Sequence, residues 1–112
     1  MTADRINRVF QHAAGRLDDN NDALILNIDI EGRVAEIIDE VKYERDGLVE
    51  TWGHIHWKIQ GDKFYMHAIS LAGGGIYRST VTIDEQDFED DLMEALGDIL
   101  ACIQHDYIDE GP

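Results

Sequence analysis

Glycine-containing turns divide the middle of the chain into short segments at nearly regular intervals. These turns lie at Gly32, Gly47, Gly61 and residues 73–75. Glycine adopts the backbone conformations of tight turns readily, and the Asp46-Gly47 pair is a strong hairpin signal. Consecutive strands joined by short turns pair with their neighbours in antiparallel order. The sequence therefore predicts an antiparallel β-meander of four to five strands.

The residue pattern between these turns is typical of β-strands. Residues 24–31 alternate between apolar and other positions, which is the period of a half-buried strand. Residues 48–59 are rich in Val, Thr, Trp and Ile, which are common in strands. Residues 63–71 and 76–83 complete the predicted sheet.

Residues 34–45 fit two structures. Apolar residues at positions 34, 37, 38 and 41 have the spacing of a helix face. The hairpin signal that follows at 46–47 instead favours a strand, because hairpins join strands. The strand is our preferred interpretation.

Amphipathic helices are predicted on both sides of the sheet. The first covers residues 3–17, has Thr2 as its N-cap, and ends at the polar cluster of residues 18–22. The second covers residues 85–107, with Asp84 as its N-cap. The apolar stripes are Ile6, Val9, Phe10, Ala13, Ala14 and Leu17 in the first helix, and Phe88, Leu92, Ala95, Leu96, Ile99, Ile103 and Tyr107 in the second.

These elements together define the expected fold class. Two helices can cover one face of a sheet, so we predict a two-layer α+β fold with an N-terminal helix, the meander and an acidic C-terminal helix. A chain of 112 residues fits one domain, residues 1–112.

The net charge restricts the classes of partner. Nine Lys and Arg stand against 24 Asp and Glu, which gives a formal charge of −15. Such a protein repels phosphate backbones, so direct binding to nucleic acid or an anionic membrane is not expected. The sequence has one cysteine, no apolar run long enough to span a membrane and no secretory signal at its start. We therefore expect a cytoplasmic protein.

The negative charge is concentrated in the last third of the chain. Residues 1–78 contain all nine basic residues and 13 acids, whereas residues 79–112 contain 11 acids and no Lys or Arg. Five of these acids fall on one arc of the second helix and span about 16 Å. Their spacing of about 3.3 Å per charge is close to the ~3.4 Å of one DNA strand. The predicted partner-binding residues are Asp84, Glu85, Asp87, Asp90, Asp91, Glu94 and Asp98.

The acidic arc also has a structural interpretation. It can serve as a solubilising surface, since acidic proteins carry many solvated carboxylates. Alternatively, Arg5, Arg8 and Arg16 of the first helix can neutralise it, within one chain or across a homodimer. The absence of Lys from the arc argues against both of these interpretations, because solvated helices usually alternate the sign of their charges.

A histidine pair on the third predicted strand is the second candidate site. His54 and His56 share one face of that strand at about 7 Å, and His67 on the next strand can approach them. A metal site needs a third suitable ligand and an open position, so we predict no metal and no cofactor. With Trp52, predicted on the same face, the pair forms either a secondary protein-binding surface or the sheet face beneath the helices.

Nothing in the sequence indicates catalysis. No Ser, His and Asp grouping stands out, and the carboxylates are too numerous to single out an acid and a base. Carboxylates near Cys102 make it a poor nucleophile. Residues 73–75 lack the following Lys of a phosphate loop. We therefore predict a non-enzymatic protein without catalytic residues.

The expected function follows from the acidic helix. We predict an inhibitor that occupies the nucleic-acid groove of a basic protein or ribonucleoprotein complex by imitating phosphate charge. Phage-encoded anti-CRISPR and anti-restriction proteins and toxin-immunity proteins are similar in charge and size, although no motif is shared. The alternatives are a secretion-type chaperone that binds an effector peptide on an apolar groove of the sheet, and a small metalloprotein that uses His54, His56 and His67.

Overall fold

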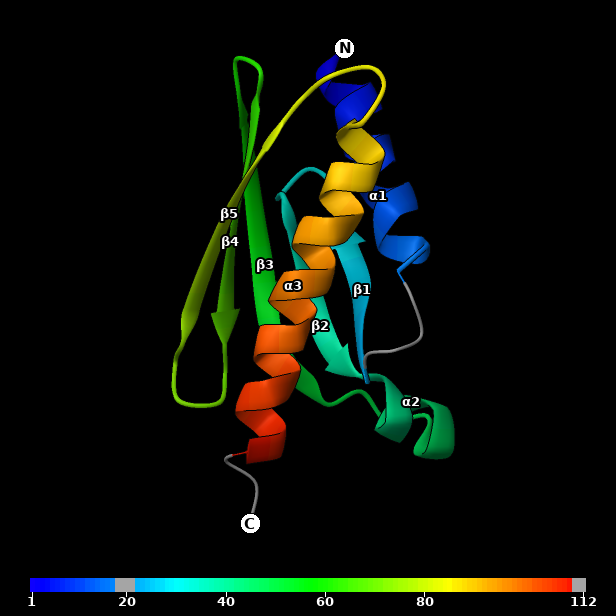
Figure 1. The fold of residues 1–112 in the computed structure, drawn as a ribbon. Coiled ribbons are helices and arrows are strands. Elements are labelled where there is room, and N and C mark those ends of the chain that lie inside the picture. Colours follow the sequence, from blue (N-terminus) through cyan, green and yellow to red (C-terminus); the bar gives the residue numbers. More distant parts are fainter. Residues whose placement is uncertain (18–21, 110–112) are drawn as a thin grey trace.

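The computed structural model describes residues 1–17 and 22–109. Its elements are α1 (Ala3–Gly15), β1 (Ala23–Asp29), β2 (Val34–Asp39), α2 (Glu40–Asp46), β3 (Thr51–Gln60), β4 (Lys63–Ser70), β5 (Ile76–Thr82) and α3 (Phe88–Asp109). The strands form one antiparallel sheet in the order β1-β2-β3-β4-β5. Helices α1 and α3 lie on the same side of this sheet (Figure 1). The predicted α+β fold is therefore confirmed, with five strands.

Helix α1 follows the predicted apolar stripe. Thr2 is its N-cap, and the Thr2 side chain accepts a hydrogen bond from the backbone N–H of Arg5. The helix ends at Gly15, two residues earlier than predicted. Most of the polar cluster that was expected to end it, residues 18–21, lies outside the described residues.

Residues 34–46 form a strand and then a helix. Strand β2 ends at Asp39, whose carboxylate accepts a hydrogen bond from the backbone N–H of Lys42 at 3.1 Å and so caps α2. Gly47 ends this helix in a left-handed conformation with φ of 66°. The preferred strand interpretation is therefore wrong for residues 40–45, because both ends of that segment carry helix caps.

A cluster of aromatic rings joins the two layers. Phe10 of α1 stacks on Trp57 of β3 at 4.3 Å between ring centroids, and Phe64 of β4 lies 5.7 Å from both Phe10 and Phe88 of α3. The indole N–H of Trp57 donates a buried hydrogen bond to Asn7 at 3.1 Å. Offset and edge-to-face ring pairs stabilise a core beyond the area that they bury. This cluster therefore fixes both helices to the sheet.

Helix α3 begins later than predicted. It starts at Phe88, whereas residues 85–87 form a turn. The carboxylate of Asp84 accepts hydrogen bonds from the backbone N–H groups of Gln86 and Asp87. Asp84 therefore caps this turn rather than the helix. The buried stripe of α3 is confirmed, and Leu100 belongs to it as well.

A bulge in β3 moves Trp52 to the helix side of the sheet. Ile37 pairs with Gly53 and Ile38 pairs with Thr51, so Trp52 is an extra residue between two registers. Its side chain is 6% exposed and stacks on Tyr107 of α3 at 5.0 Å. The prediction that Trp52 shares a surface with His54 and His56 is therefore wrong, because the bulge breaks the two-residue alternation.

None of the helices in the described part of the chain combines the length and the apolar character needed to cross a bilayer.

Candidate functional site

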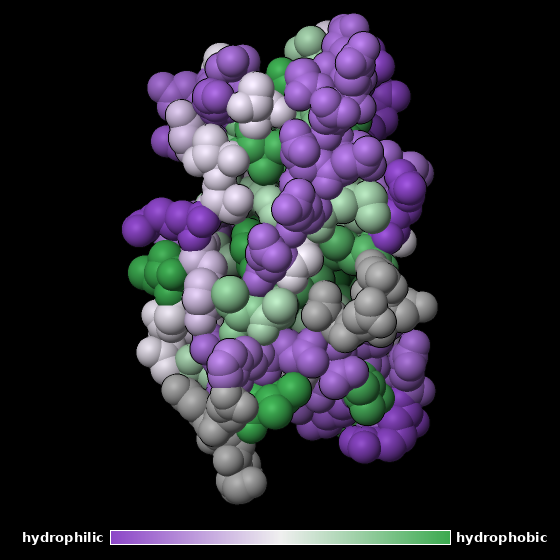
Figure 2. All heavy atoms as spheres, in the orientation of Figure 1, coloured by the Kyte–Doolittle hydropathy of each residue, from purple (hydrophilic) through white to green (hydrophobic). Residues whose placement is uncertain are grey.

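The outer side of α3 carries a row of free carboxylates, which we call the acidic face. Its members are Asp90, Asp91, Glu94 and Asp98 on α3 and Asp87 in the turn directly before it, and all five are exposed. None of them forms an ion pair with any of the residues that the structure describes. Figure 2, which views the molecule from the α3 side, shows hydrophilic side chains following the upper part of this helix. The charges that the sequence places on one arc therefore point outward and remain uncompensated.

The basic side of α1 neutralises a different carboxylate. Arg16 binds Glu89 at 2.7 Å from Nη1 to Oε2, and His12 also bonds to Glu89. The hydrogen bond from His12, aided by the charge of Arg16, lowers the pKa of Glu89. Arg5 and Arg8 take part in no ion pair among the described residues. Neutralisation of α3 by α1 is thus confined to Glu89, which is not part of the acidic face.

The two acids before α3 differ in availability. Asp84 is half-buried, and one of its carboxylate oxygens accepts two backbone hydrogen bonds. Glu85 is exposed in the turn that follows. Of these two predicted binding residues, only Glu85 therefore extends the acidic face.

The acidic face borders the free edge of the sheet. Ile83 donates its N–H to Asp62, and Ser70 donates its N–H to Gly75. Because antiparallel partners alternate, the N–H and C=O groups of residues 76, 78, 80 and 82 point away from β4. Two adjoining hollows of about 340 and 300 Å³ lie between β5 and α3. They share Ser79, Ala95 and Asp98, and Asp91 and Glu94 line the first of them.

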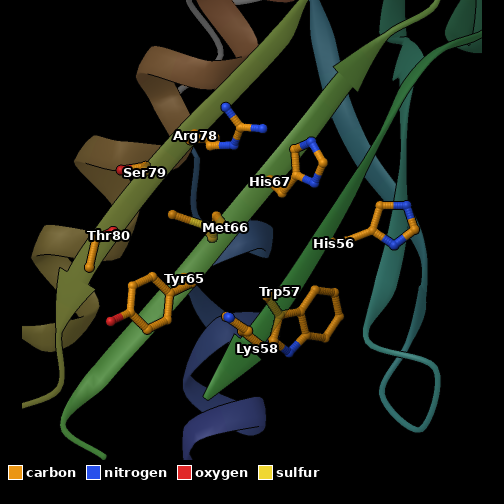
Figure 3. Close-up of a pocket in the computed structure, with 9 residues that line it drawn as sticks. All are labelled: His56, Trp57, Lys58, Tyr65, Met66, His67, Arg78, Ser79 and Thr80. Atoms are coloured by element: carbon orange, nitrogen blue, oxygen red, sulfur yellow. The ribbon is translucent and has the colours of Figure 1, made fainter. Parts of the chain in front are cut away.

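The other side of the sheet, which neither α1 nor α3 covers, carries the predicted histidines. We call it the open face. His56, His67 and Arg78 are direct cross-strand neighbours on β3, β4 and β5. Figure 3 shows their side chains side by side, with the helices behind the sheet. Lys58 and Tyr65 form the next row, with the Lys58 Nζ 5.1 Å from the centroid of the Tyr65 ring. These side chains line a hollow of about 440 Å³.

One nitrogen of this row is buried without a partner. His67 Nε2 is shielded from solvent and makes no hydrogen bond. Leaving a buried polar atom unpaired costs about 1–3 kcal/mol. The row therefore contains a ring nitrogen that can form a hydrogen bond and forms none with the described residues.

The histidines do not assemble a metal-ligand set. His54 pairs with Ile69, one row away from His56 and His67. No group of three or more His, Cys, Asp or Glu in the described ranges is close enough to hold a metal ion. The metalloprotein alternative therefore has no ligand cluster to build on.

Polar side chains also interrupt the apolar positions of the open face. Ile69 and Ile76 lie in the row that contains Glu36 and His54. The next row along β4 contains His56, His67 and Arg78. An effector-binding chaperone would need a continuous apolar groove here. Ile76 is exposed on the open face, but a group of exposed large apolar side chains occurs on α2 and the segment after it, namely Val41, Tyr43, Leu48 and Val49.

Arg78 is the member of this row that sequence reasoning missed. It stands 22 positions after His56 in the chain, and only the pairing of three strands brings the two together. A compositional signal was present, because residues 51–82 contain three bases and a single acid, Asp62, in a chain with 24 acids.

Comparisons with family models, with curated proteins and with solved structures found no match to the chain.

Proposed function

We propose that this chain is a non-catalytic interaction protein of the cytoplasm. In this proposal the acidic face occupies the nucleic-acid-binding groove of a basic protein or ribonucleoprotein complex and thereby inhibits it. The protein resembles anti-CRISPR, anti-restriction and toxin-immunity inhibitors in charge and size, and such inhibitors define the class to which we assign it.

The observation that carries the proposal is the exposed state of five carboxylates, four on one side of α3 and one in the turn before it, that form no ion pair with a described residue. Like charges three or four residues apart destabilise a helix by a few tenths of a kcal/mol per pair. Within α3, Asp90–Glu94 and Glu94–Asp98 are two such pairs, and no Lys or Arg of the helix relieves them. A surface that weakens its own helix is most simply explained by a positively charged partner.

The helix also gives these charges a rigid spacing. Its buried stripe fixes its rotation against the sheet, because Leu92 and Leu96 are fully buried. The carboxylates therefore stay on the outer side and are presented as a preformed row. Such a row attracts a basic groove at long range and accelerates association, and both effects weaken as salt is added.

Affinity capture from a host lysate tests the proposal. The wild-type chain should retain a basic nucleic-acid-binding protein at low salt, and that protein should be released by high salt and displaced by DNA or RNA oligonucleotides. A variant that combines Asp90→Lys, Asp91→Lys and Glu94→Lys should fold and should not retain it.

A matched variant controls for net charge. Glu31→Lys, Glu44→Lys and Asp62→Lys change the total charge equally at exposed positions away from α3, and this variant should still capture the partner. The proposal fails if both triple variants lose binding equally, if the α3 variant keeps the partner, or if nucleic acid does not compete.

A further inference from the structure

The open face gathers hydrogen-bond donors from three strands into one short row. His56, His67 and Arg78 are paired across β3, β4 and β5. Neighbouring strands are about 4.8 Å apart, so the row measures about 10 Å from end to end. Lys58 and Thr80 stand on the same face, two residues further along β3 and β5. Guanidinium and ammonium groups only donate hydrogen bonds, and an imidazole donates at least one.

The surroundings of this row are unusually free of carboxylates. None of the residues that line the hollow is acidic. The nearest carboxylate by register is Glu36, which pairs with His54 and accepts hydrogen bonds from Asn27 and Thr51. Neither Arg78 nor Lys58 forms an ion pair with another described residue. Among the described residues, Lys58 therefore has no paired carboxylate, and Arg78 shares a neighbouring hollow with Asp98 but forms no ion pair with it.

We propose that the open face binds a small molecule that carries a phosphate group, with the phosphate lying across His56, His67 and Arg78. The Arg78 fork binds two phosphate oxygens side by side, as guanidinium groups commonly do. His67 Nε2, which has no partner in the structure, donates to the same group. Lys58 adds a positive charge at the rim of the hollow.

The negative net charge of the protein favours a small phosphate compound over a polyanion as the ligand. The net charge of −15 opposes a long phosphate backbone. A single phosphate is influenced mainly by its surroundings, because charges are screened over about 8 Å at physiological ionic strength. Asp98 of the acidic face lines a neighbouring hollow together with Arg78, and its repulsion is smaller for a ligand with one phosphate group than for a chain of phosphates.

The rings of the hollow favour a phosphate attached to a planar group. Tyr65 stands beside the row, and His56 is the ring at the β3 end of it, as the close-up view shows (Figure 3). Aromatic rings bind planar groups by stacking. The hollow of about 440 Å³ also falls within the ~300–1,000 Å³ of pockets for small molecules.

Histidine NMR signals of the full chain provide the test. Inorganic phosphate, adenosine monophosphate and adenosine would be added separately at constant pH and ionic strength. The signals of His56 and His67 should shift saturably with both phosphate compounds, and His12 on α1 should serve as the reference that does not shift. Stronger binding of adenosine monophosphate than of phosphate would identify a phosphate ester as the ligand. Equal binding would identify free phosphate.

Two variants make the test specific. Arg78→Gln should weaken phosphate binding by about tenfold or more, because it removes a charged donor pair from the oxyanion. Arg5→Gln removes the same charge from an exposed position on α1 and should leave binding unchanged. The proposal is overturned if neither phosphate compound binds in the millimolar range, if adenosine binds as well as its monophosphate, if His12 responds equally, or if Arg78→Gln has no effect. This result is independent of the capture experiment on α3.

Discussion

The acidic face and the donor row of the open face (His56, His67 and Arg78) are built in different ways. The acidic face takes five carboxylates from residues 87–98, which lie in α3 and the turn directly before it. The donor row takes one side chain from each of three strands that span residues 51–82. The acidic face thus brings together acids that are close in the sequence, whereas the sheet brings together residues that are distant in the sequence. A local surface can be recognised in the sequence, and a non-local surface needs the strand register.

Of the changes predicted here, a substitution in the core between the two faces should change the free energy of unfolding most. Phe64 is fully buried and contacts rings from α1, β3 and α3. Phe64→Ala should lower the free energy of unfolding by about 3–5 kcal/mol, since it leaves a cavity in the core. Urea denaturation followed by circular dichroism measures this loss. Phe64→Leu keeps most of the volume and should lose less, and a loss below about 1 kcal/mol for the alanine variant would show that the aromatic cluster does not hold the layers together.

The paired and unpaired carboxylates of α3 should respond differently to acid. The folded protein lowers the pKa of Glu89 below its ordinary value of 4.5. The stabilisation from Glu89 is therefore fully present above that value and is lost as the pH falls through the lowered pKa. Glu89→Gln should reduce the loss of stability between about pH 5 and about pH 3, by less than about 1 kcal/mol because the pair is near the surface.

Glu94→Gln is the matched control for this measurement, because Glu94 is exposed and forms no ion pair with a described residue. Its unfolding curve should follow the wild-type dependence on pH. Identical behaviour of the two variants in urea denaturation across this pH range would contradict the distinction between Glu89 and the acidic face.

Neutralising part of the acidic face should produce the smallest effect and one of opposite sign. Glu94→Gln combined with Asp98→Asn removes like-charge pairs from α3 beyond its first turn and should raise the free energy of unfolding by a few tenths of a kcal/mol at low salt. The gain should shrink as salt is added. Differential scanning calorimetry at two ionic strengths measures it, with Glu31→Gln and Asp62→Asn as the charge-matched control. A decrease in stability would mean that these carboxylates are compensated in the folded protein.

The helices and most strands could be predicted because their signals are local. The 3.6-residue period of Phe88, Leu92 and Leu96 places the acids of α3 outside, and the structure keeps them there. The caps of α2 at Asp39 and Gly47 are also local, but the hairpin signal at the same glycine concealed them. The residues of that segment fit both a strand pattern and a helix pattern, and from Glu40 to Asp46 the chain adopts the helix.

The remaining features depend on contacts between distant segments. The position of Trp52 follows from a bulge that appears only when β2 and β3 are paired. Tyr107, on which its ring stacks, lies 55 residues further along the chain. The row of His56, His67 and Arg78 requires three strands in register. The sequence predicted that His67 can approach His56 from the next strand, and the register confirms this, but the arginine beside them was not predicted.

The free edge of β5 has a consequence for self-association. Unpaired main-chain groups at a sheet edge invite another copy to add its own strand, which is a common route to fibrous aggregates. Asp91, Glu94 and Asp98 stand alongside this edge. Two molecules that approached each other through β5 would bring both sets of carboxylates together, and their repulsion would oppose polymerisation.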